Sequence, residues 1–300
     1  MELRQLKQLL VLSETLNFHR AAERLHMAQP PLSTAIKKLE EELGVQLFER
    51  LPAGLKATPA GAVVLRYART TLFYADEVRR AAKEGAAGEQ GELRVGFVGS
   101  STYGLMPRIL PAFRRAYPRV DLIIEESTTA ELLRRLGEHS LDVALVRFPV
   151  LEPSSARLVL LQHDHLVLAV PTDSPYAARD EIALEELAQE PFIGYSRTHV
   201  PAMHALVLYA FQTAGVQPRI TQEAIQVQTI LSLVESGLGV ALVPAVARRN
   251  AGSVALVKVT GLAEIIKVGI ALAVHPDTAS PTAANFMAMA LQLMAADAAD

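Results

Sequence analysis

Residues 18–43 read FHRAAERLHMAQPPLSTAIKKLEEEL, a stretch that predicts two short helices joined by a tight turn. Asn17 precedes the first helix and can accept a hydrogen bond from one of its free N–H groups. Pro30 and Pro31 indicate the start of the second helix. A proline in the first turn of a helix loses no intrahelical hydrogen bond. The second helix has an apolar residue on each turn of one face, which predicts a buried stripe. The stripe comprises Leu32, Ile36, Leu39 and Leu43.

The opposite face of the second helix is polar. Its hydroxyl groups can meet base edges or phosphates, and its lysines would lie near phosphates. We therefore expect this helix to read the major groove of DNA; the alternative is an ordinary helical hairpin with a solvated lysine face. The expected contact residues are Gln29, Pro30, Pro31, Ser33, Thr34, Lys37 and Lys38.

A small wing is expected to follow these helices. Gly44 would end the second helix in a left-handed conformation. Residues 45–47 and 55–57 can pair as two strands around a turn at residues 52–54. Arg50 and Lys56 flank the tip of the wing, where they could reach a phosphate or the minor groove of DNA. The alternative is that they are exposed basic residues that contact nothing.

Two further helices complete the N-terminal third. The first spans residues 3 to about 16 and is expected to point Leu3, Leu6 and Leu10 inward. The other begins at Thr58-Pro59 and runs to about residue 85, and its apolar and small residues recur at spacings of three and four. This seam, made of Ala60, Val63, Tyr67, Thr70 and Tyr74, predicts that two copies of the helix pack together; packing on its own domain is the alternative. The glycine-rich residues 85–91 read as a flexible joint.

From residue 92 onward, predicted strands and helices alternate, which indicates an α/β fold. Strands are expected near residues 93–98, 120–126, 143–146, 166–170, 192–195, 220–223, 240–243 and 270–274. Helices are expected near residues 103–117, 130–138, 202–214, 227–235 and 282–298. The sequence therefore predicts a multi-domain protein whose larger part is α/β.

Polar side chains follow three of these strands. Ser100 and Ser101 lie between a strand and a helix, where a hydroxyl and free N–H groups make an anion site. Thr129 has the same position after the next strand, and Arg147 follows the third, where its guanidinium could pair with a carboxylate. One hydroxyl alone could be only a helix cap. The carboxyl ends of such strands are where α/β sheets bind ligands, so we expect a carboxylate site here.

The second half of this region offers further candidates. Ser196 precedes the helix expected at 202–214 and could close over the same ligand. Pro201, Met203 and Val227 would supply apolar walls. Residues 163–165 read His-Asp-His, and two histidines on one strand face could bind a metal. Because no third ligand is near, we interpret them as the start of a hinge strand and expect neither a metal nor a cofactor.

Composition limits the function further. The chain has 300 residues and no cysteine, which excludes disulfides, thiol catalysis and cysteine-ligated zinc. No apolar run approaches the roughly 18 residues of a membrane span, and Glu2, Arg4 and Lys7 interrupt any signal peptide, so we expect a cytoplasmic protein. The net charge of −3 is unevenly distributed. Residues 1–90 hold 13 Lys and Arg against 11 Asp and Glu, and the remainder holds 16 against 21.

The chain resembles LysR-type transcriptional regulators. In the N-terminal region the resemblance lies in residues 1–6, Phe18, Ala21-Ala22, Leu25, residues 29–33, residues 39–44, Leu47-Phe48-Glu49-Arg50 and Thr58-Pro59-Ala60-Gly61. Farther on it lies in residues 96–100, residues 105–108, Leu141-Asp142-Val143-Ala144, residues 237–240 and Val243-Pro244. The resemblance implies a winged helix-turn-helix at 1–58, a linker and dimerisation helix at 59–91, and an effector-binding domain at 92–300. That domain would resemble periplasmic binding proteins, with lobe I at 92–162 and 268–300 and lobe II at 163–267.

The sequence looks most like the benzoate- and muconate-responsive branch of that family. In that branch, residues matching Ser100, Thr129 and Arg147 bind ligand carboxylates. Met203 stands where the branch has an aromatic residue, which leaves the identity of the ligand open. The resemblance also implies a homodimer or homotetramer and contact with RNA polymerase.

The leading hypothesis is a DNA-binding regulator of catabolic promoters that senses a small carboxylate, an aromatic acid or its ring-cleavage product, in a cleft between lobes. One alternative is a regulator with a different effector, or an architectural DNA-binding protein with none. The other is an enzyme acting on a small acid. The sequence has no nucleophile elbow, P-loop or dinucleotide fingerprint, so we expect no enzyme.

Overall fold

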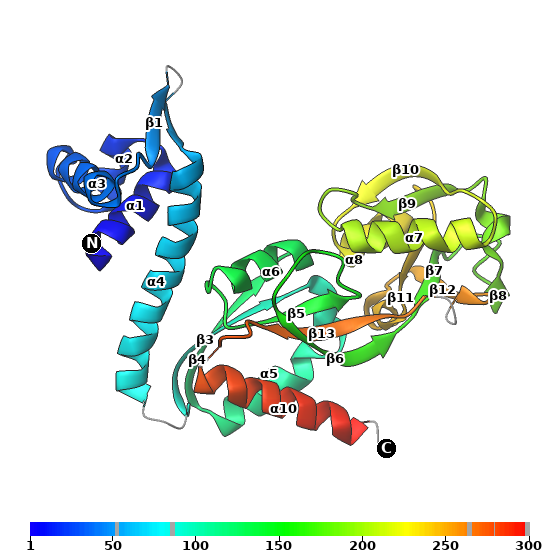
Figure 1. Ribbon diagram of the computed structural model, residues 1–300. Coiled ribbons are helices and arrows are strands. Elements are labelled where there is room, and N and C mark those ends of the chain that lie inside the picture. Colours follow the sequence, from blue (N-terminus) through cyan, green and yellow to red (C-terminus); the bar gives the residue numbers. More distant parts are fainter. Residues whose placement is uncertain (52–53, 85–87, 263–265, 279, 298–300) are drawn as a thin grey trace. The chain divides into compact units, whose positions relative to one another are not determined.

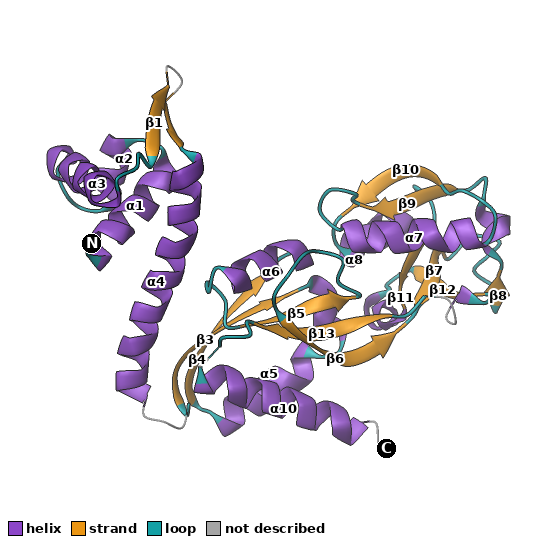
Figure 2. Cartoon of the chain, viewed as in Figure 1, coloured by secondary structure: helices purple, strands orange, loops and turns teal. Residues whose placement is uncertain are grey.

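A computed structural model shows that the chain forms two compact units (Figures 1 and 2). The structure describes residues 1–51, 54–84, 88–262, 266–278 and 280–297. The N-terminal unit is Met1–Gly85 together with Glu138–Ser140, and the C-terminal unit is Ala86–Gly137 together with Leu141–Asp300. None of the described helices is both long enough and apolar enough to span a membrane.

The N-terminal unit is a helical bundle with a two-stranded hairpin. Its helices are α1 (Leu3–Thr15), α2 (Phe18–Arg24), α3 (Gln29–Leu43) and the long α4 (Pro59–Glu84). Its strands β1 (Phe48–Leu51) and β2 (Gly54–Ala57) are antiparallel. The core is formed by leucines and alanines of α1 to α4, by Ile36 of α3 and by Leu47 and Phe48. The helices match the sequence prediction closely.

The first wing strand was predicted at residues 45–47, and that prediction was wrong, because these residues complete the end of α3. The backbone N–H of Val45 donates to the carbonyl of Glu40, and the Glu40 Oε1 accepts from the N–H groups of Leu47 and Phe48 at 2.7 and 3.2 Å. The N–H groups of Val45 and Leu47 are used in this way and are not available to a strand. The strand therefore starts at Phe48.

Two leucines that were expected to face the core are exposed instead. Leu3 is 40% exposed and Leu43 is 37% exposed. Leu3 is the first residue of α1 and Leu43 the last of α3, so each lies beyond the turns that its neighbours cover. Gly44 ends α3 with a positive φ of 71°, as predicted.

The C-terminal unit has two lobes, each with its own sheet. The first sheet has the strand order β4 (Arg119–Glu126), β3 (Gln90–Phe97), β5 (Val143–Phe148), β13 (Val268–Val274) and β6 (Arg157–Asp164). β3 is parallel to β4 and β5, whereas β13 is antiparallel to β5 and β6. The helices α5 (Met106–Ala116) and α10 (Pro281–Asp297) pack together on one face, and α6 (Thr129–Gly137) lies on the other (Figure 2).

The second lobe contains a four-stranded sheet and a strand pair. The sheet order is β11 (Ala241–Pro244), β7 (Leu166–Pro171), β12 (Val254–Val259) and β8 (Glu181–Ile182). The parallel pair is β9 (Pro191–Tyr195) and β10 (Arg219–Ala224). The helices are α7 (Pro201–Thr213), α8 (Val227–Glu235) and the short 3₁₀ turns η2 (Leu184–Leu187) and η3 (Ala245–Asn250). The strands β6, β8 and β12 were not predicted.

The segment at residues 163–165 was predicted to start a strand, but it ends one. His163 and Asp164 are the last residues of β6, and β7 begins at Leu166 in the other lobe. The Asp164 carboxylate accepts the N–H of His165 at 2.8 Å and that of Val246 at 3.1 Å. It therefore fastens the point where the chain passes from one lobe to the other.

The helix predicted at residues 103–117 is divided. A 3₁₀ turn, η1 (Gly99–Tyr103), precedes α5, and Gly104 between them has an extended φ of −161°. Pro107 in the first turn of α5 sets the start of that helix. Part of the predicted joint, residues 85–87, and the last predicted helical residue, 298, lie outside the described residues.

Close packing at Gly61 gives a testable prediction. A Cβ atom at Gly61, in the first turns of α4, would lie 2.0 Å from the backbone carbonyl oxygen of Leu47. We expect Gly61→Ala to lower the free energy of unfolding of the N-terminal unit by about 1–3 kcal/mol, because backbone atoms must shift. Urea denaturation with hydrogen exchange of α1 and α4 amides measures this change. Ala62→Ser at the neighbouring exposed position is the control, and equal effects of the two substitutions would contradict the assigned contact.

Candidate functional site

The pair α2–α3 has the geometry of a helix-turn-helix. The Asn17 side chain accepts the N–H groups of His19 and Arg20 at 2.9 and 3.1 Å, so the predicted N-cap of α2 is confirmed. Pro30 and Pro31 lie in the first turn of α3, also as predicted. Leu32, Ile36 and Leu39 are buried against α1 and α2. This packing fixes which side of α3 faces water.

The water-facing side of α3 carries the predicted DNA-contacting residues. Ser33 is half-buried, and the other six are exposed: Gln29, Pro30, Pro31, Thr34, Lys37 and Lys38. The Lys37 ammonium lies 3.6 Å from the Glu41 carboxylate, but the lysine side chain remains 77% exposed. Such an exposed pair contributes little stability, so the ammonium is free to exchange Glu41 for a phosphate.

A groove separates α3 from the wing. It is lined by Ser33 and Lys37 on one side and by Gln46, Glu49 and Leu55 on the other. Lys56 is exposed on β2, 3.9 Å from Glu49. Arg50 belongs to β1, and its side chain lies outside the described residues. The hydroxyl and ammonium groups of α3 therefore border a channel open to water.

The helix α4 presents an apolar face to water. The Thr58 Oγ1 accepts the N–H of Gly61 at 2.9 Å and caps the helix, as predicted. On the predicted seam, Val63, Tyr67 and Tyr74 are exposed, Tyr67 by 61%. Exposed aromatic and aliphatic side chains at heptad-like spacing are typical of a helix that pairs with a second copy.

In the C-terminal unit, three of the predicted effector residues come together between the lobes. The Arg147 guanidinium at the end of β5 donates from Nη2 to the Ser100 hydroxyl on η1 at 2.7 Å. The backbone N–H of Arg147 donates to Thr129 Oγ1 at 3.2 Å. All three residues are buried. Strands β3, β4 and β5 end at one edge of the sheet, so the loops and helices that follow them bring these groups together.

The charge of Arg147 has no anionic partner among the described residues. Its one side-chain hydrogen bond goes to a neutral hydroxyl, and it forms no ion pair there. Burial lowers the pKa of the guanidinium, while Tyr195, Asp164 and Tyr103 act in the opposite direction. Asp164 acts on it from beyond ion-pair distance, and a buried charge without a close counter-ion is costly. The site is therefore suited to bind an anion.

A small pocket opens beside this guanidinium. Its walls are Val98, Ser127, Thr128, Thr129 and Arg147 from the first lobe and Val200, Ile225 and Gln226 from the second. The cavity volume is about 10 Å³, which is room for about one water molecule. Of the residues predicted for this site, Thr129 and Arg147 line the pocket, and Ser100 reaches it through its bond to Arg147.

The other predicted effector residues lie elsewhere. Ser101 is buried and its hydroxyl donates to the Val98 carbonyl at 2.8 Å, so it holds the turn η1. The Ser196 hydroxyl is 3.1 Å from His199 Nδ1. Met203 and Val227 are buried in the core of the second lobe and do not line the pocket. Pro201 starts α7 next to the lining residue Val200.

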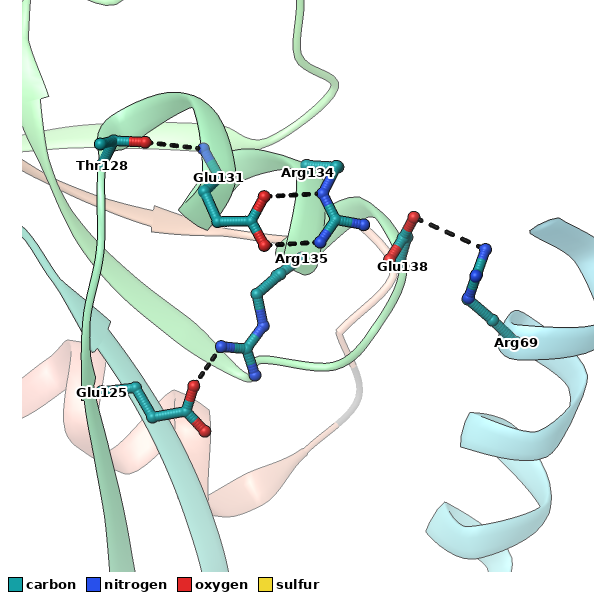
Figure 3. A network of polar contacts seen from close by, with 7 residues as sticks. All are labelled: Arg69, Glu125, Thr128, Glu131, Arg134, Arg135 and Glu138. Atoms are coloured by element: carbon teal, nitrogen blue, oxygen red, sulfur yellow. Dashed lines mark hydrogen bonds and ion pairs between the residues drawn. The ribbon is translucent and has the colours of Figure 1, made fainter. Parts of the chain in front are cut away.

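The helix α6, which carries Thr129, is fixed at both ends (Figure 3). At its start, the Thr128 Oγ1 accepts the N–H of Glu131 at 3.3 Å. Toward its end, Arg135 forms an ion pair with Glu125 of β4, and this hydrogen bond lowers the pKa of Glu125. Glu131 accepts two hydrogen bonds from Arg134 in the same helix. These contacts hold Thr129 in place against β5.

Sequence reasoning did not identify two tyrosines near Arg147. Tyr103 on η1 belongs to the apolar core of the second lobe, and its hydroxyl donates to Gln228 Oε1 of α8 at 3.1 Å. Arg249 of η3 donates to the Tyr103 carbonyl at 3.0 Å. Tyr195 at the end of β9 is fully buried, and its hydroxyl has no hydrogen-bond partner among the described residues. Both tyrosines read as ordinary core residues in the sequence, because only tertiary packing brings them to Arg147.

The chain matches two protein-family models. The model described as "Bacterial regulatory helix-turn-helix protein, lysR family" matches residues 3–62. The model described as "LysR substrate binding domain" matches residues 86–295. Together they cover the helix-turn-helix and both lobes described above.

Individual relatives agree with these matches. The transcriptional regulator AlsR of Bacillus subtilis is 34% identical over 83% of this chain and 82% of its own length. The transcriptional regulator BenM of Acinetobacter baylyi is 35% identical over 82% of this chain and 81% of its own length. Among solved structures, full-length CbnR complexed with its target DNA is 28% identical, with a TM-score of 0.72 over 97% of this chain and 99% of that one.

The buried Tyr195 gives a prediction for alkaline pH. Burial raises its pKa from 10.0 to about 12, so between these pH values the unfolded chain releases a proton that the folded protein retains. Its contribution to stability is complete below pH 10 and is lost as the pH rises toward 12, by about 1.4 kcal/mol at pH 11. Tyr195→Phe should therefore reduce the loss of stability between pH 9 and 11, measured by urea denaturation. The control is Tyr209→Phe at an exposed tyrosine, and identical pH profiles for wild type and Tyr195→Phe would refute the prediction.

Proposed function

Because the chain belongs to the LysR family of bacterial DNA-binding transcriptional regulators, we propose that it regulates promoters in response to a small carboxylate bound between the lobes of its effector domain. The family matches confirm the predicted resemblance and the prediction of a regulator rather than an enzyme.

One observation carries the effector part of this proposal, namely the buried guanidinium of Arg147 without an anionic partner among the described residues. A carboxylate that takes two hydrogen bonds from it would supply the missing counter-charge. The hydroxyls of Ser100 and Thr129 are within reach of the same group. Aromatic acids and their ring-cleavage products are the first candidates, because of the resemblance to the benzoate- and muconate-responsive branch.

The proposed response is a shift between two arrangements of the lobes. The chain crosses between them after Asp164 and again before Val268, and these crossings form the hinge. Tyr103 and Arg249 connect the lobes at η1 and η3. A ligand held by Arg147 of one lobe and by the second lobe favours the closed arrangement to the extent that it binds that arrangement more tightly.

On the DNA side, we propose that α3 enters the major groove and that Ser33, Thr34, Lys37 and Lys38 contact bases or phosphates. Gln29, Pro30 and Pro31 would approach the groove with the start of the helix, and Arg50 and Lys56 would contact the backbone from the wing. The exposed seam of α4 supports a homodimer or homotetramer that grips two half-sites. Activation or repression would then involve RNA polymerase at the promoter.

For DNA binding, we predict that Lys37→Ala weakens binding to a duplex selected from a random pool by the wild-type protein. Each phosphate contact contributes about 0.9 to the slope of log K against log salt, so the slope should fall by about that amount. Fluorescence anisotropy at several salt concentrations measures both effects. Lys258→Ala, at an exposed lysine of β12, is the control. An unchanged affinity and slope in Lys37→Ala would remove Lys37 from the contacts.

For the effector site, we predict that Arg147→Met abolishes stabilisation by carboxylates and the ligand-dependent change in promoter output. A ligand at 100 times its Kd should raise the wild-type free energy of unfolding by about 2.7 kcal/mol. A thermal-shift screen of benzoate, salicylate and muconates, followed by a promoter assay, measures both. Basal DNA binding should persist in the variant, which shows that it is folded. A normal dose response in Arg147→Met would refute the assigned role.

A further inference from the structure

A carboxylate lies in the groove between α3 and the wing. Glu40 lines this groove together with Ser33 and Lys37 of the same helix. These three residues are four and three positions apart, so they share one face of α3. A carboxylate on a face that meets DNA would repel the phosphates. Its place there therefore calls for a role that outweighs this repulsion.

The Glu40 carboxylate is bound by the start of the wing. Its Oε1 accepts the backbone N–H of Leu47 at 2.7 Å and that of Phe48 at 3.2 Å. Hydrogen bonds to a carboxylate are roughly twice as strong as those between neutral groups. Leu47 immediately precedes β1, and Phe48 is the first residue of that strand. A side chain of the helix that is proposed to enter the major groove thus holds the first strand of the wing.

The base of the wing is also attached to α4 and to the core. The N–H of Thr58 donates to the carbonyl of Leu47 at 3.0 Å, and the Thr58 hydroxyl donates to that of Gln46 at 2.7 Å. The side chains of Leu47 and Phe48 are buried in the core of the N-terminal unit. Without the Glu40 carboxylate, the wing would therefore stay folded on α4 and lose these hydrogen bonds to α3.

The wing carries a cation close to this attachment. In the hairpin, Lys56 of β2 lies opposite Glu49, the residue that follows Phe48. Its side chain is 69% exposed, and its ammonium is 3.9 Å from the Glu49 carboxylate, so this pair is weak. Binding groups act only when they are held within about 0.5 Å of the productive geometry. A small shift of the hairpin relative to α3 would therefore be enough to separate Lys56 from a phosphate.

We propose that Glu40 is a positioning residue for DNA binding. Its carboxylate fixes the wing to α3, so that Lys56 reaches the DNA backbone while Ser33 and Lys37 are in the major groove. Glu40 itself contacts the N–H groups of the wing and not the DNA. This inference rests on the proposed function, since it explains how two of the proposed contact surfaces are held at a fixed spacing.

The salt dependence of DNA binding by the full chain tests this role, measured by fluorescence anisotropy on a duplex selected by the wild-type protein. Glu40→Ala should lower the slope of log K against log salt by about 0.9, the contribution of one phosphate contact. Lys56→Ala should lower the slope by the same amount in the wild-type background, and should have no effect in the Glu40→Ala background. Lys37→Ala should lower the slope equally in both backgrounds, because α3 still reaches the DNA.

Three further variants separate positioning from charge and from folding. Glu40→Gln keeps an acceptor oxygen at the same reach and should restore the effect of Lys56→Ala. Glu40→Asp keeps the charge but is one methylene shorter, so it should behave like Glu40→Ala and takes its place if Glu40→Ala does not fold. Glu42→Ala removes another carboxylate of α3, which pairs with the N-terminal ammonium, and is the matched control.

Each contrary outcome has a distinct meaning. An equal effect of Lys56→Ala with and without the Glu40 side chain overturns the inference and leaves the proposed function standing. Loss of the Lys37→Ala effect in Glu40→Ala, or no restoration by Glu40→Gln, shows a general effect on the fold and also overturns the positioning role. If neither Lys37→Ala nor Lys56→Ala changes the slope in the wild-type background, both the proposed DNA contacts and this inference are wrong.

Discussion

The elements that follow β3, β4 and β5 have to accommodate a buried positive charge. The Arg147 guanidinium lies at the end of β5, where its one side-chain hydrogen bond within the described residues goes to the Ser100 hydroxyl. Removing a charge from water costs several kcal/mol unless it is paired. The surrounding elements therefore have to hold it in place by other means: η1 supplies Ser100, and α6, fixed by its cap and its ion pair to β4, supplies Thr129. This charge, which has no close counter-ion among the described residues, supports the proposal that the pocket takes an anion.

The same turn that carries Ser100 also joins the lobes. Three residues later, Tyr103 is buried in the core of the second lobe and hydrogen-bonds to Gln228, while its carbonyl accepts from Arg249. A ligand that takes hold of Ser100 and Arg147 therefore acts on a turn that already contacts both lobes. This turn alone could therefore couple ligand binding to the angle between the lobes. Such coupling requires that the ligand binds one arrangement of the lobes more tightly than the other.

Local patterns predicted the helix-turn-helix well, because its buried stripe, its Asn17 cap and its proline start are all short-range features. They failed where tertiary contacts decide. The Glu40 carboxylate accepts hydrogen bonds from the N–H groups of Leu47 and Phe48, so the first wing strand begins later in the chain than predicted. The sequence of residues 45–47 gives no sign of this contact with α3. In the pocket, the residues at strand ends were predictable from the βα order. Tyr195 and Gln226 were not, because they belong to the second lobe and reach the site only when it packs against the first. Tyr103 lies on the same turn as Ser100 but read as an ordinary core residue.

The two proposed binding surfaces use positive charge in opposite ways. Lys37 is exposed and weakly paired, so its free form is hydrated and its attraction to phosphate is screened by salt. Arg147 is buried, so its guanidinium already loses its hydration when the domain folds. Salt therefore screens its attraction to an anion far less. DNA binding should therefore weaken steeply as salt rises while effector binding changes little. The proposed DNA surface and the proposed effector site therefore differ in their dependence on ionic strength.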